Sequence, residues 1–157
     1  MPEPTPFRLL VTGSRTWRDA HAVTFALDAA SLDALGREVI VVHGACEEGA
    51  DLLADRAARD LGFTVEPHPA DWESPCRPEC KPGHRRRRRD GTDYCPAAGN
   101  YRNEEMVRLG ADVCLCFVMP CARPGWCSRR GPHDSHGASD CAERAEKAGI
   151  PVRRFRP

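Results

Sequence analysis

FRLLVTGSR, residues 7–15, sets the architecture of this chain. Its apolar run ends in the small residues of TGSR, and a helix-like pattern follows from Trp17, so we predict a strand that leads through a turn into a helix. Such a turn can hold phosphate, because a helix N-terminus offers free N–H groups and Arg15 can add a charge-assisted hydrogen bond. The same small residues would also suit a tight turn that binds nothing.

The composition indicates one domain without a dominant charge. The chain has 157 residues, and its 23 Lys and Arg residues balance 23 Asp and Glu residues, so no overall field draws it to nucleic acid or to a membrane. We see no basic segment followed by a long apolar run, and no stretch long enough to span a membrane. We therefore expect a single cytoplasmic domain over residues 1–157, with no membrane partner.

Apolar segments that alternate with helical patterns predict an α/β fold. Because strands separated by helices wind into right-handed crossovers, we expect a Rossmann-like, doubly wound, five-stranded parallel sheet. A chain that starts at the centre of the sheet, adds two strands outward and then crosses back has the strand order 3-2-1-4-5. After the first strand, the expected strands cover residues 38–43, 63–67, 112–118 and 150–155, and the expected helices cover residues 17–35, 50–61, 100–109 and 138–148.

Two segments interrupt this pattern, at residues 70–98 and 119–137, and both are rich in Cys, His, Pro and Gly. Nine cysteines are an odd number, and thiols stay reduced in the cytoplasm. Short Cys–His spacings therefore favour metal ligation over disulfides. An insertion without an apolar pattern also needs something other than a hydrophobic core to hold it.

The first cluster is predicted to be a structural zinc site. Its four ligands have spacings that a tetrahedral zinc ion can gather, and a full set of protein ligands leaves no open position for catalytic water. The alternative is a set of surface thiols scattered by chance. The predicted ligands are Cys76, Cys80, His84 and Cys95.

A second zinc site is expected in the loop after the fourth strand, where it would overhang the ligand cleft. Cys141, Cys114 or Cys116 could replace one member, although two cysteines two positions apart on a strand are expected to pack as small apolar residues. A catalytic metal is the less favoured alternative. The predicted ligands are Cys121, Cys127, His133 and His136.

The ligand cleft is expected where the strand order reverses, beyond the carboxyl ends of the strands. There the first turn would hold phosphate through N–H groups and Arg15, Arg102 would bind a second anionic group, and glycines would allow a ligand to approach the backbone closely. The residues that we place at this cleft are Gly13, Ser14, Arg15, His43, Gly44, Gly49, Asp51, Arg102 and Gly137.

Three residues near this cleft keep a structural alternative beside the functional one. His43 ends the second strand and would either contact the ligand or form structural hydrogen bonds. Asp51 would either contact a ribose or cap the second helix. Trp17 would either stack on a base or pack at the start of the first helix.

Five motifs together resemble the YspA-like proteins of the SLOG superfamily, which also contains the LOG phosphoribohydrolases and the DprA recombination mediators. The resemblance implies a Rossmann-like sheet, a homodimer or higher homo-oligomer, and a pocket for nucleotides or NAD-derived nucleotide sugars; phages also carry such proteins. The motifs are TGSR at 12–15, HGACEEGAD at 43–51, CPAAGNYRNEEM at 95–106, GADVCLCF at 110–117 and GASDCAERAEKAGIPV at 137–152.

The resemblance carries over to LOG catalysis only in part. LOG enzymes cleave the bond between base and ribose 5-phosphate with an Arg, which Arg102 matches, and with a Glu that follows a PGGxGT loop. Here only Gly137 of that loop matches, and Cys141 stands where the Glu would be. Asp140 or Glu143 would have to replace it, although a carboxylate moved by one or two positions points elsewhere on a helix.

The run of five arginines at residues 85–89 lies between two predicted metal ligands. It could bind nucleic-acid phosphates, form a solvated loop tip, or cover an anionic ligand in the cleft. We favour a protein that binds a nucleotide-derived small molecule, as a sensor or by sequestering it. The alternatives are an N-glycosidic nucleotide hydrolase that uses Arg102, and a nucleic-acid binder.

Overall fold

A computed structural model, which describes residues 1–122, 127 and 129–157, contains a five-stranded parallel sheet. Its order is β3-β2-β1-β6-β7, and each neighbouring pair is parallel. This sheet confirms the predicted α/β class. The strands are β1 (Phe7–Gly13), β2 (Val39–His43), β3 (Thr64–Pro67), β6 (Val113–Phe117) and β7 (Val152–Phe155).

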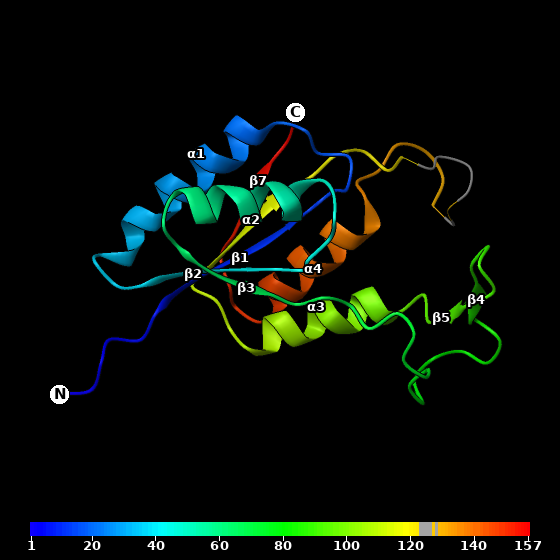
Figure 1. The fold of residues 1–157 in the computed structure, drawn as a ribbon. Helices are drawn as coiled ribbons and strands as arrows, with labels where there is room; N and C mark the ends of the chain where they lie inside the picture. Colours follow the sequence, from blue (N-terminus) through cyan, green and yellow to red (C-terminus); the bar gives the residue numbers. More distant parts are fainter. Residues whose placement is uncertain (123–126, 128) are drawn as a thin grey trace.

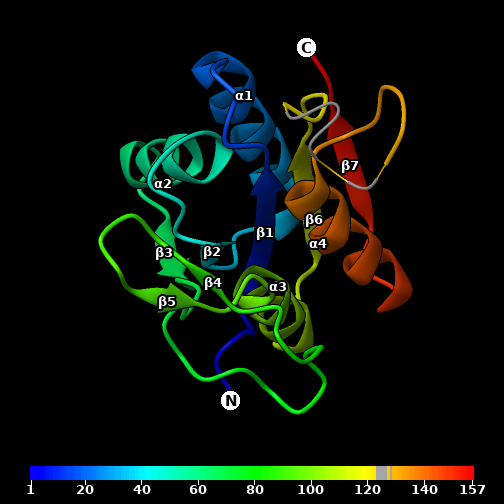
Figure 2. The ribbon, with the colours of Figure 1, turned by 90° about the vertical axis from the view of Figure 1, so that its right-hand side faces the viewer.

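Helices cover both faces of the sheet (Figures 1 and 2). On one face α1 (Ala20–Ser31) packs against α2 (Ala50–Asp60), and on the other α3 (Ala98–Arg108) packs against α4 (His136–Lys147). The change of face falls between β3 and α3, so the strand order reverses between β1 and β6. Ligands of such sheets bind at this reversal. No helix in the described ranges combines the length and apolar character that a bilayer crossing requires.

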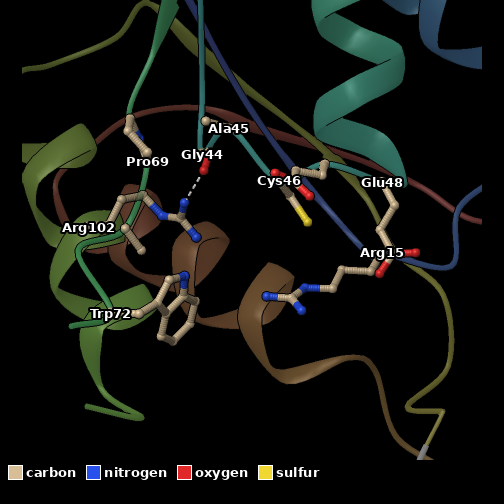
Figure 3. Close-up of a pocket in the computed structure, with 10 residues that line it drawn as sticks. Arg15, Gly44, Ala45, Cys46, Glu48, Pro69, Trp72 and Arg102 are labelled. Carbon is tan, nitrogen blue, oxygen red and sulfur yellow. Dashed lines mark hydrogen bonds between the residues drawn. The ribbon is translucent and has the colours of Figure 1, made fainter. Parts of the chain in front are cut away.

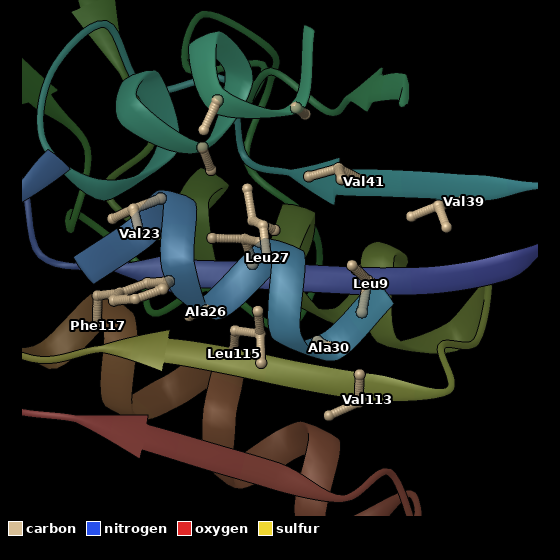
Figure 4. Close-up of a cluster of buried hydrophobic side chains, with 14 of the residues drawn as sticks. Leu9, Val23, Ala26, Leu27, Ala30, Val39, Val41, Val113, Leu115 and Phe117 are labelled. Atoms are coloured by element: carbon tan, nitrogen blue, oxygen red, sulfur yellow. The ribbon is translucent and has the colours of Figure 1, made fainter. Parts of the chain in front are cut away.

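The core on the α1 and α2 face of the sheet is built from side chains of β1, β2 and β6 and of the two helices that cover them (Figure 4). Every residue of β6 is buried, as expected for a strand covered on both faces. Trp17 is 2% exposed and its ring lies 5.4 Å from that of Phe117. It therefore packs in the core, and a stacking role on a ligand is excluded. Cys114 and Cys116 are fully buried on β6, as predicted.

The first helix starts three residues later than predicted. Asp19 is its N-cap and accepts a hydrogen bond from the Ala22 N–H at 2.9 Å, which satisfies a backbone donor that the helix itself leaves free. At its other end a short 3₁₀ turn, Leu32–Ala34, carries the chain to Leu35 in the left-handed region. The predicted helix over residues 17–35 was thus too long at its start and not α-helical in its last turn.

The insertion after β3 contains a small antiparallel hairpin that the sequence pattern did not predict. It consists of β4 (Arg86–Arg87) and β5 (Asp93–Tyr94) and lies apart from the main sheet (Figure 1). The insertion also ends earlier than expected, because α3 starts at Ala98 rather than at residue 100. Among residues 70–97 only Cys95 is buried, so hydrophobic burial contributes little to holding this segment.

Candidate ligand-binding site

A cavity of about 480 Å³ lies at the carboxyl edge of the sheet, where the strand order reverses. The TGSR turn, the start of α3, the loop after β6 and the start of α4 form its walls. A neighbouring cavity of about 570 Å³, which we call the outer cavity, shares Arg15, Trp72 and Arg102 with this inner cavity and is also lined by residues after β2. Figure 3 shows Arg102 and Trp72 on one side of this outer cavity, Arg15 reaching in from the other, and Cys46 between them.

Ser14 connects the first turn to the loop after β6. Its N–H donates to the Phe117 carbonyl at 2.9 Å, and its hydroxyl accepts from the Met119 N–H at 2.9 Å. The same hydroxyl lies 2.6 Å from the Ser135 hydroxyl. Because Ser14 is only 3% exposed, its first task is to hold the two loops together. Gly13, Ser14 and Arg15 all line the inner cavity.

Arg15 supplies a free cation at this edge. Its side chain is exposed, lines both cavities and forms no ion pair within the described ranges. The backbone N–H groups of Arg15 and Thr16 likewise have no acceptor in the part of the chain that the structure describes. The turn therefore presents one guanidinium and two N–H donors that can bind an anion.

The glycines that we placed at the cleft differ in what requires them. A Cβ on Gly13 would lie 2.3 Å from Cβ of Ala50, and one on Gly49, whose φ is +72°, would lie 2.4 Å from the Ser14 carbonyl oxygen. A Cβ on Gly44 would lie 2.4 Å from Nη1 of Arg102. Packing between protein segments thus requires glycine at positions 13 and 49, whereas a side chain at position 44 would displace the end of the Arg102 side chain. A Cβ on Gly137 would meet open space, although Gly137 lines the cavity.

Arg102 ties α3 to the ends of two strands. Nη1 donates to the Gly44 carbonyl and, at 3.2 Å, to the His68 carbonyl, and Nε donates to Oδ1 of Asn103 at 3.0 Å. Nη2 has no acceptor among the described residues, and Arg102 lines the inner and the outer cavity. Its guanidinium is therefore fixed in position and has one edge free for an anion.

Asp51 lines the inner cavity from the first turn of α2. Its carboxylate is 7% exposed and accepts a hydrogen bond from the Cys46 N–H at 3.2 Å. Burial raises the pKa of Asp51, and that hydrogen bond and the charge of Arg102 oppose this rise. Asp51 thus orders the loop before α2, and its carboxyl also faces the cavity.

His43 does not line either cavity. Its ring is 3% exposed, Nδ1 accepts from the Ala45 N–H at 2.9 Å, and Nε2 lies 2.8 Å from Oδ2 of Asp55. Since Nδ1 is an acceptor, the proton sits on Nε2 and is donated to Asp55. The structural alternative therefore describes His43.

The N-terminus of α4 is open toward the inner cavity. The Ser135 hydroxyl does not cap the helix, because it binds Ser14 instead. Within the described ranges, the N–H groups of His136, Gly137 and Ala138 have no acceptor, and all three residues line the cavity. The helix dipole and these three donors favour a negatively charged group here.

The position of the LOG-type Glu carries no acid in this structure. Cys141 is fully buried, and burial raises the pKa of its thiol to about 12. Asp140 accepts hydrogen bonds from Asn103 at 3.1 Å and from Arg144 at 2.9 Å. Neither Asp140 nor the exposed Glu143 lines the cavity, so the two expected replacements do not reach it.

The first Cys/His cluster comes together as predicted. The ligand atoms of Cys76, Cys80, His84 and Cys95 all lie within 4.8 Å of one another. Sγ of Cys76 is 3.0 Å from Nε2 of His84, and Sγ of Cys80 is 3.8 Å from Sγ of Cys95. Two thiolates on one tetrahedral ion are about 3.8 Å apart when each metal–sulfur bond is about 2.3 Å. This cluster could therefore hold a metal ion.

The second cluster also assembles the four predicted side chains. The ligand atoms of Cys121, Cys127, His133 and His136 lie within 4.8 Å of one another, so this cluster too could hold a metal ion. Residues 123–126 and 128 of the loop 119–137 lie outside the described residues. Unlike the first cluster, this one adjoins the inner cavity, which Cys121, Cys127 and His136 line.

The arginine run mainly contacts other residues of its own insertion. Arg85 donates to the Ser74 carbonyl at 2.9 Å, Arg87 pairs with Asp93, and Arg88 lies over the Tyr94 ring. Arg86 and Arg89 are exposed and form no ion pair within the described ranges. No arginine of the run lines either cavity, so the idea that the run covers the ligand has no support.

Three residues of the site were not found from the sequence. Trp72 lines both cavities, Asn103 joins Arg102 to the Gly137 carbonyl at 3.3 Å, and Ser135 binds Ser14. Asn103 follows Arg102 directly and could have been singled out with it. Trp72 lies in a segment without periodicity, so only the fold reveals its position.

Comparison with known proteins agrees with this architecture. The family model of the YspA, cpYpsA-related SLOG family matches residues 7–74. The Gene 61 protein of Mycobacterium phage D29 is 41% identical over 153 residues, which cover 94% of this chain and 95% of the phage protein. No solved structure matches at a significant level. The chain therefore belongs to the YspA, cpYpsA-related SLOG family.

Proposed function

We propose that the protein binds a nucleotide or an NAD-derived nucleotide sugar in the inner cavity and acts as a sensor or by sequestering this ligand. The observation that carries the proposal is the set of free donors at one edge of the sheet. The open N-terminus of α4, the turn N–H groups and the guanidinium groups of Arg15 and Arg102 all reach the same cavity. Membership of the SLOG family supports nucleotide-related binding.

The donors would divide the ligand between them. The α4 N-terminus and the turn at Arg15 would bind one phosphate, because each offers backbone N–H groups without an acceptor among the described residues. The free edge of Arg102 would bind a second anionic group, which in a dinucleotide is the next phosphate. His43 is not part of this proposal, since its ring is engaged by Asp55.

Both Cys/His clusters are proposed to hold zinc. Mixed Cys and His ligands in sets of four match structural zinc sites. Zinc in the first cluster would fix the insertion, whereas zinc in the second would stiffen the loop that forms a wall of the cavity. Elemental analysis and native mass spectrometry of the purified protein would test this with an expected two zinc ions per chain.

Calorimetric titration with AMP and ADP-ribose tests the ligand proposal. Replacing Arg15 by Ala should weaken binding about 10-fold or more, since a hydrogen bond to a charged group contributes about 1.5–3 kcal/mol. Arg56→Ala is the control, because Arg56 is also an exposed arginine but lines neither cavity. Equal affinities of the Arg15 and Arg56 variants, or no binding to the unchanged protein, would contradict the proposal.

N-glycosidic cleavage is a second candidate function, favoured by one observation. Asp51 is the only carboxylate among the described residues that line the inner cavity, and its raised pKa keeps more of it protonated. A protonated carboxyl can donate a proton to a leaving base. Chromatography of nucleoside monophosphates after incubation tests this, with Asp51→Asn as the variant. If the protein without substitutions leaves all of these substrates intact, cleavage is contradicted and only the binding proposal remains.

A homodimer is proposed from the family resemblance, together with exposed apolar side chains at one end of α1. Leu32 and Leu35, in and directly after the 3₁₀ turn that follows α1, are 74% and 90% exposed, and Phe25 on α1 itself is 75% exposed. Analytical ultracentrifugation would show a dimer that dissociates when Leu35 is replaced by Glu. Within the arginine run, Arg86 and Arg89 are exposed without an ion pair among the described residues, and we do not favour nucleic-acid binding on this basis.

A further inference from the structure

We propose that Trp72 forms a stacking subsite for the base of the ligand, and that the first Cys/His cluster keeps this subsite in place. The inference rests on the proposed function and names the part of the nucleotide that the outer cavity takes. Trp72 belongs to the insertion after β3, so this insertion would contribute a ligand contact in addition to those of the sheet edge.

Trp72 lies at both cavities of the candidate site. Its side chain is half-buried and lines both the inner and the outer cavity. Figure 3 shows the indole beside Arg102 and facing the Arg15 side chain across the opening. This arrangement suits a nucleotide. The two guanidinium groups could bind its phosphates, and its base could stack on the indole, because every base can stack on an aromatic ring.

Residues Gly99 and Tyr94 surround the Trp72 indole. A Cβ on Gly99 would lie 3.2 Å from Cη2 of Trp72, so the glycine at the start of α3 leaves room for the ring. The Tyr94 ring packs edge-on at 6.3 Å between centroids. The indole N–H has no acceptor within the described ranges, which leaves it free to donate to a ligand.

The backbone of Trp72 is hydrogen-bonded to a residue of the first Cys/His cluster. The Cys95 N–H donates to the Trp72 carbonyl at 2.8 Å, and Cys95 is the one buried residue of the insertion. Tyr94, which contacts the indole, precedes Cys95 directly. A metal ion held by Cys95 and its three partner ligands would therefore fix the backbone that carries Trp72.

Calorimetry with probes that contain or lack a base tests the proposal. The probes are the four ribonucleoside 5′-monophosphates and ribose 5-phosphate. At least one nucleotide should bind the unchanged protein about 10-fold more tightly than ribose 5-phosphate, since stacking contributes about 1–3 kcal/mol per base. Trp72→Ala should remove this difference without changing the affinity for ribose 5-phosphate, and Trp72→Phe should keep most of it.

The cluster is tested in the same titrations with Cys80→Ser, for which Glu79→Gln is the neighbouring control. The cysteine variant should behave like Trp72→Ala, and the control like the unchanged protein. Nucleotide affinity that is unaffected by Trp72→Ala would overturn the subsite, as would equal binding of nucleotides and ribose 5-phosphate. If the unchanged protein binds none of the probes, the proposed function itself fails.

Discussion

The parallel sheet and the insertion over residues 70–97 are stabilised in different ways. In the sheet, Leu9, Val11, Leu115 and Phe117 are fully buried between helix layers. In the insertion only Cys95 is buried, and the segment contains ion pairs and four side chains that could bind a metal ion. Burial of apolar surface thus accounts for one region, and the other requires a different source of stability.

The second Cys/His cluster lies between these two cases. Its loop follows a fully buried strand, and Ser14 and Ser135 bind it to the first turn. Since three of its ligands line the inner cavity, we expect this cluster to affect ligand binding more than folding. We therefore expect three separate effects: core substitutions change the stability of the sheet, the first cluster changes the order of the insertion, and the second cluster changes the shape of the inner cavity.

The largest effect is expected when the first cluster loses a ligand. With Cys80→Ser, amide hydrogen exchange in residues 70–97 should approach that of an unfolded chain, because structural zinc in small domains contributes on the order of 10 kcal/mol. Exchange of β1 amides should change little. If amide protection in the insertion is the same in Cys80→Ser and in the control Glu79→Gln, the segment folds without metal. The sheet and the insertion would then not differ in the way described above.

The next effect concerns the sheet. Leu115→Ala should lower the free energy of unfolding by about 3 kcal/mol, because it leaves a cavity at a fully buried position of β6. Urea denaturation measures this loss, and the metal content should stay unchanged. Arg56→Ala, at an exposed position of α2, should cost less than about 0.5 kcal/mol. Similar costs for both variants would contradict our description of the core.

Changing the second cluster should act mainly on the ligand. His136→Ala should remove one metal ion per chain and weaken nucleotide binding about 10-fold, because a wall of the inner cavity would lose its metal and with it about 1.4 kcal/mol of binding free energy. The melting temperature should change by only a few degrees. His21→Ala, an exposed histidine on α1, serves as the control. If His136→Ala lowers the free energy of unfolding as much as Leu115→Ala does, the second cluster stabilises the whole fold and does not act mainly on the ligand.

The smallest effect is a pH dependence that belongs to the sheet. Arg8 on β1 forms a two-bond ion pair with Glu66 on β3, with both distances 2.8 Å, and lowers the pKa of Glu66 to about 2. Because the folded-state pKa lies below the ordinary value, this stabilisation is present above about pH 4.5 and is lost as the pH falls toward 2.

We expect Glu66→Gln to lower stability at pH 7 by about 1 kcal/mol, since partial solvent exposure of the pair reduces its contribution. The difference between the variant and the unchanged protein, measured by urea denaturation, should shrink from pH 5 to pH 3. A difference that stays constant over this range would show that the ion pair does not contribute in this way.

Much of the fold could be predicted because its signals are local. Apolar β-branched runs such as residues 39–42 predict buried strands, and glycines such as Gly62 mark the ends of helices. The eight candidate metal-ligating side chains were also predictable, because Cys and His at short spacings in a reduced protein are typical of metal ligands. The structure brings both sets together.

The remainder depends on contacts between distant segments. The hairpin of β4 and β5 has strands of two residues each, too short for any periodic pattern. The environment of His43 depends on Asp55, one helix later, and that of Ser14 on Ser135. Trp72 acquires its place at the cavity only because the insertion folds back over α3. Such roles follow from tertiary structure, which residue patterns do not encode.

Nuclear magnetic resonance with the ¹⁵N-labelled protein tests the central claim most directly. During titration with AMP or ADP-ribose, we predict the largest amide shifts at the free donors of the cavity, namely Arg15, Thr16, His136, Gly137 and Ala138. Shifts concentrated in the arginine hairpin, or no shifts with any nucleotide, would contradict the account.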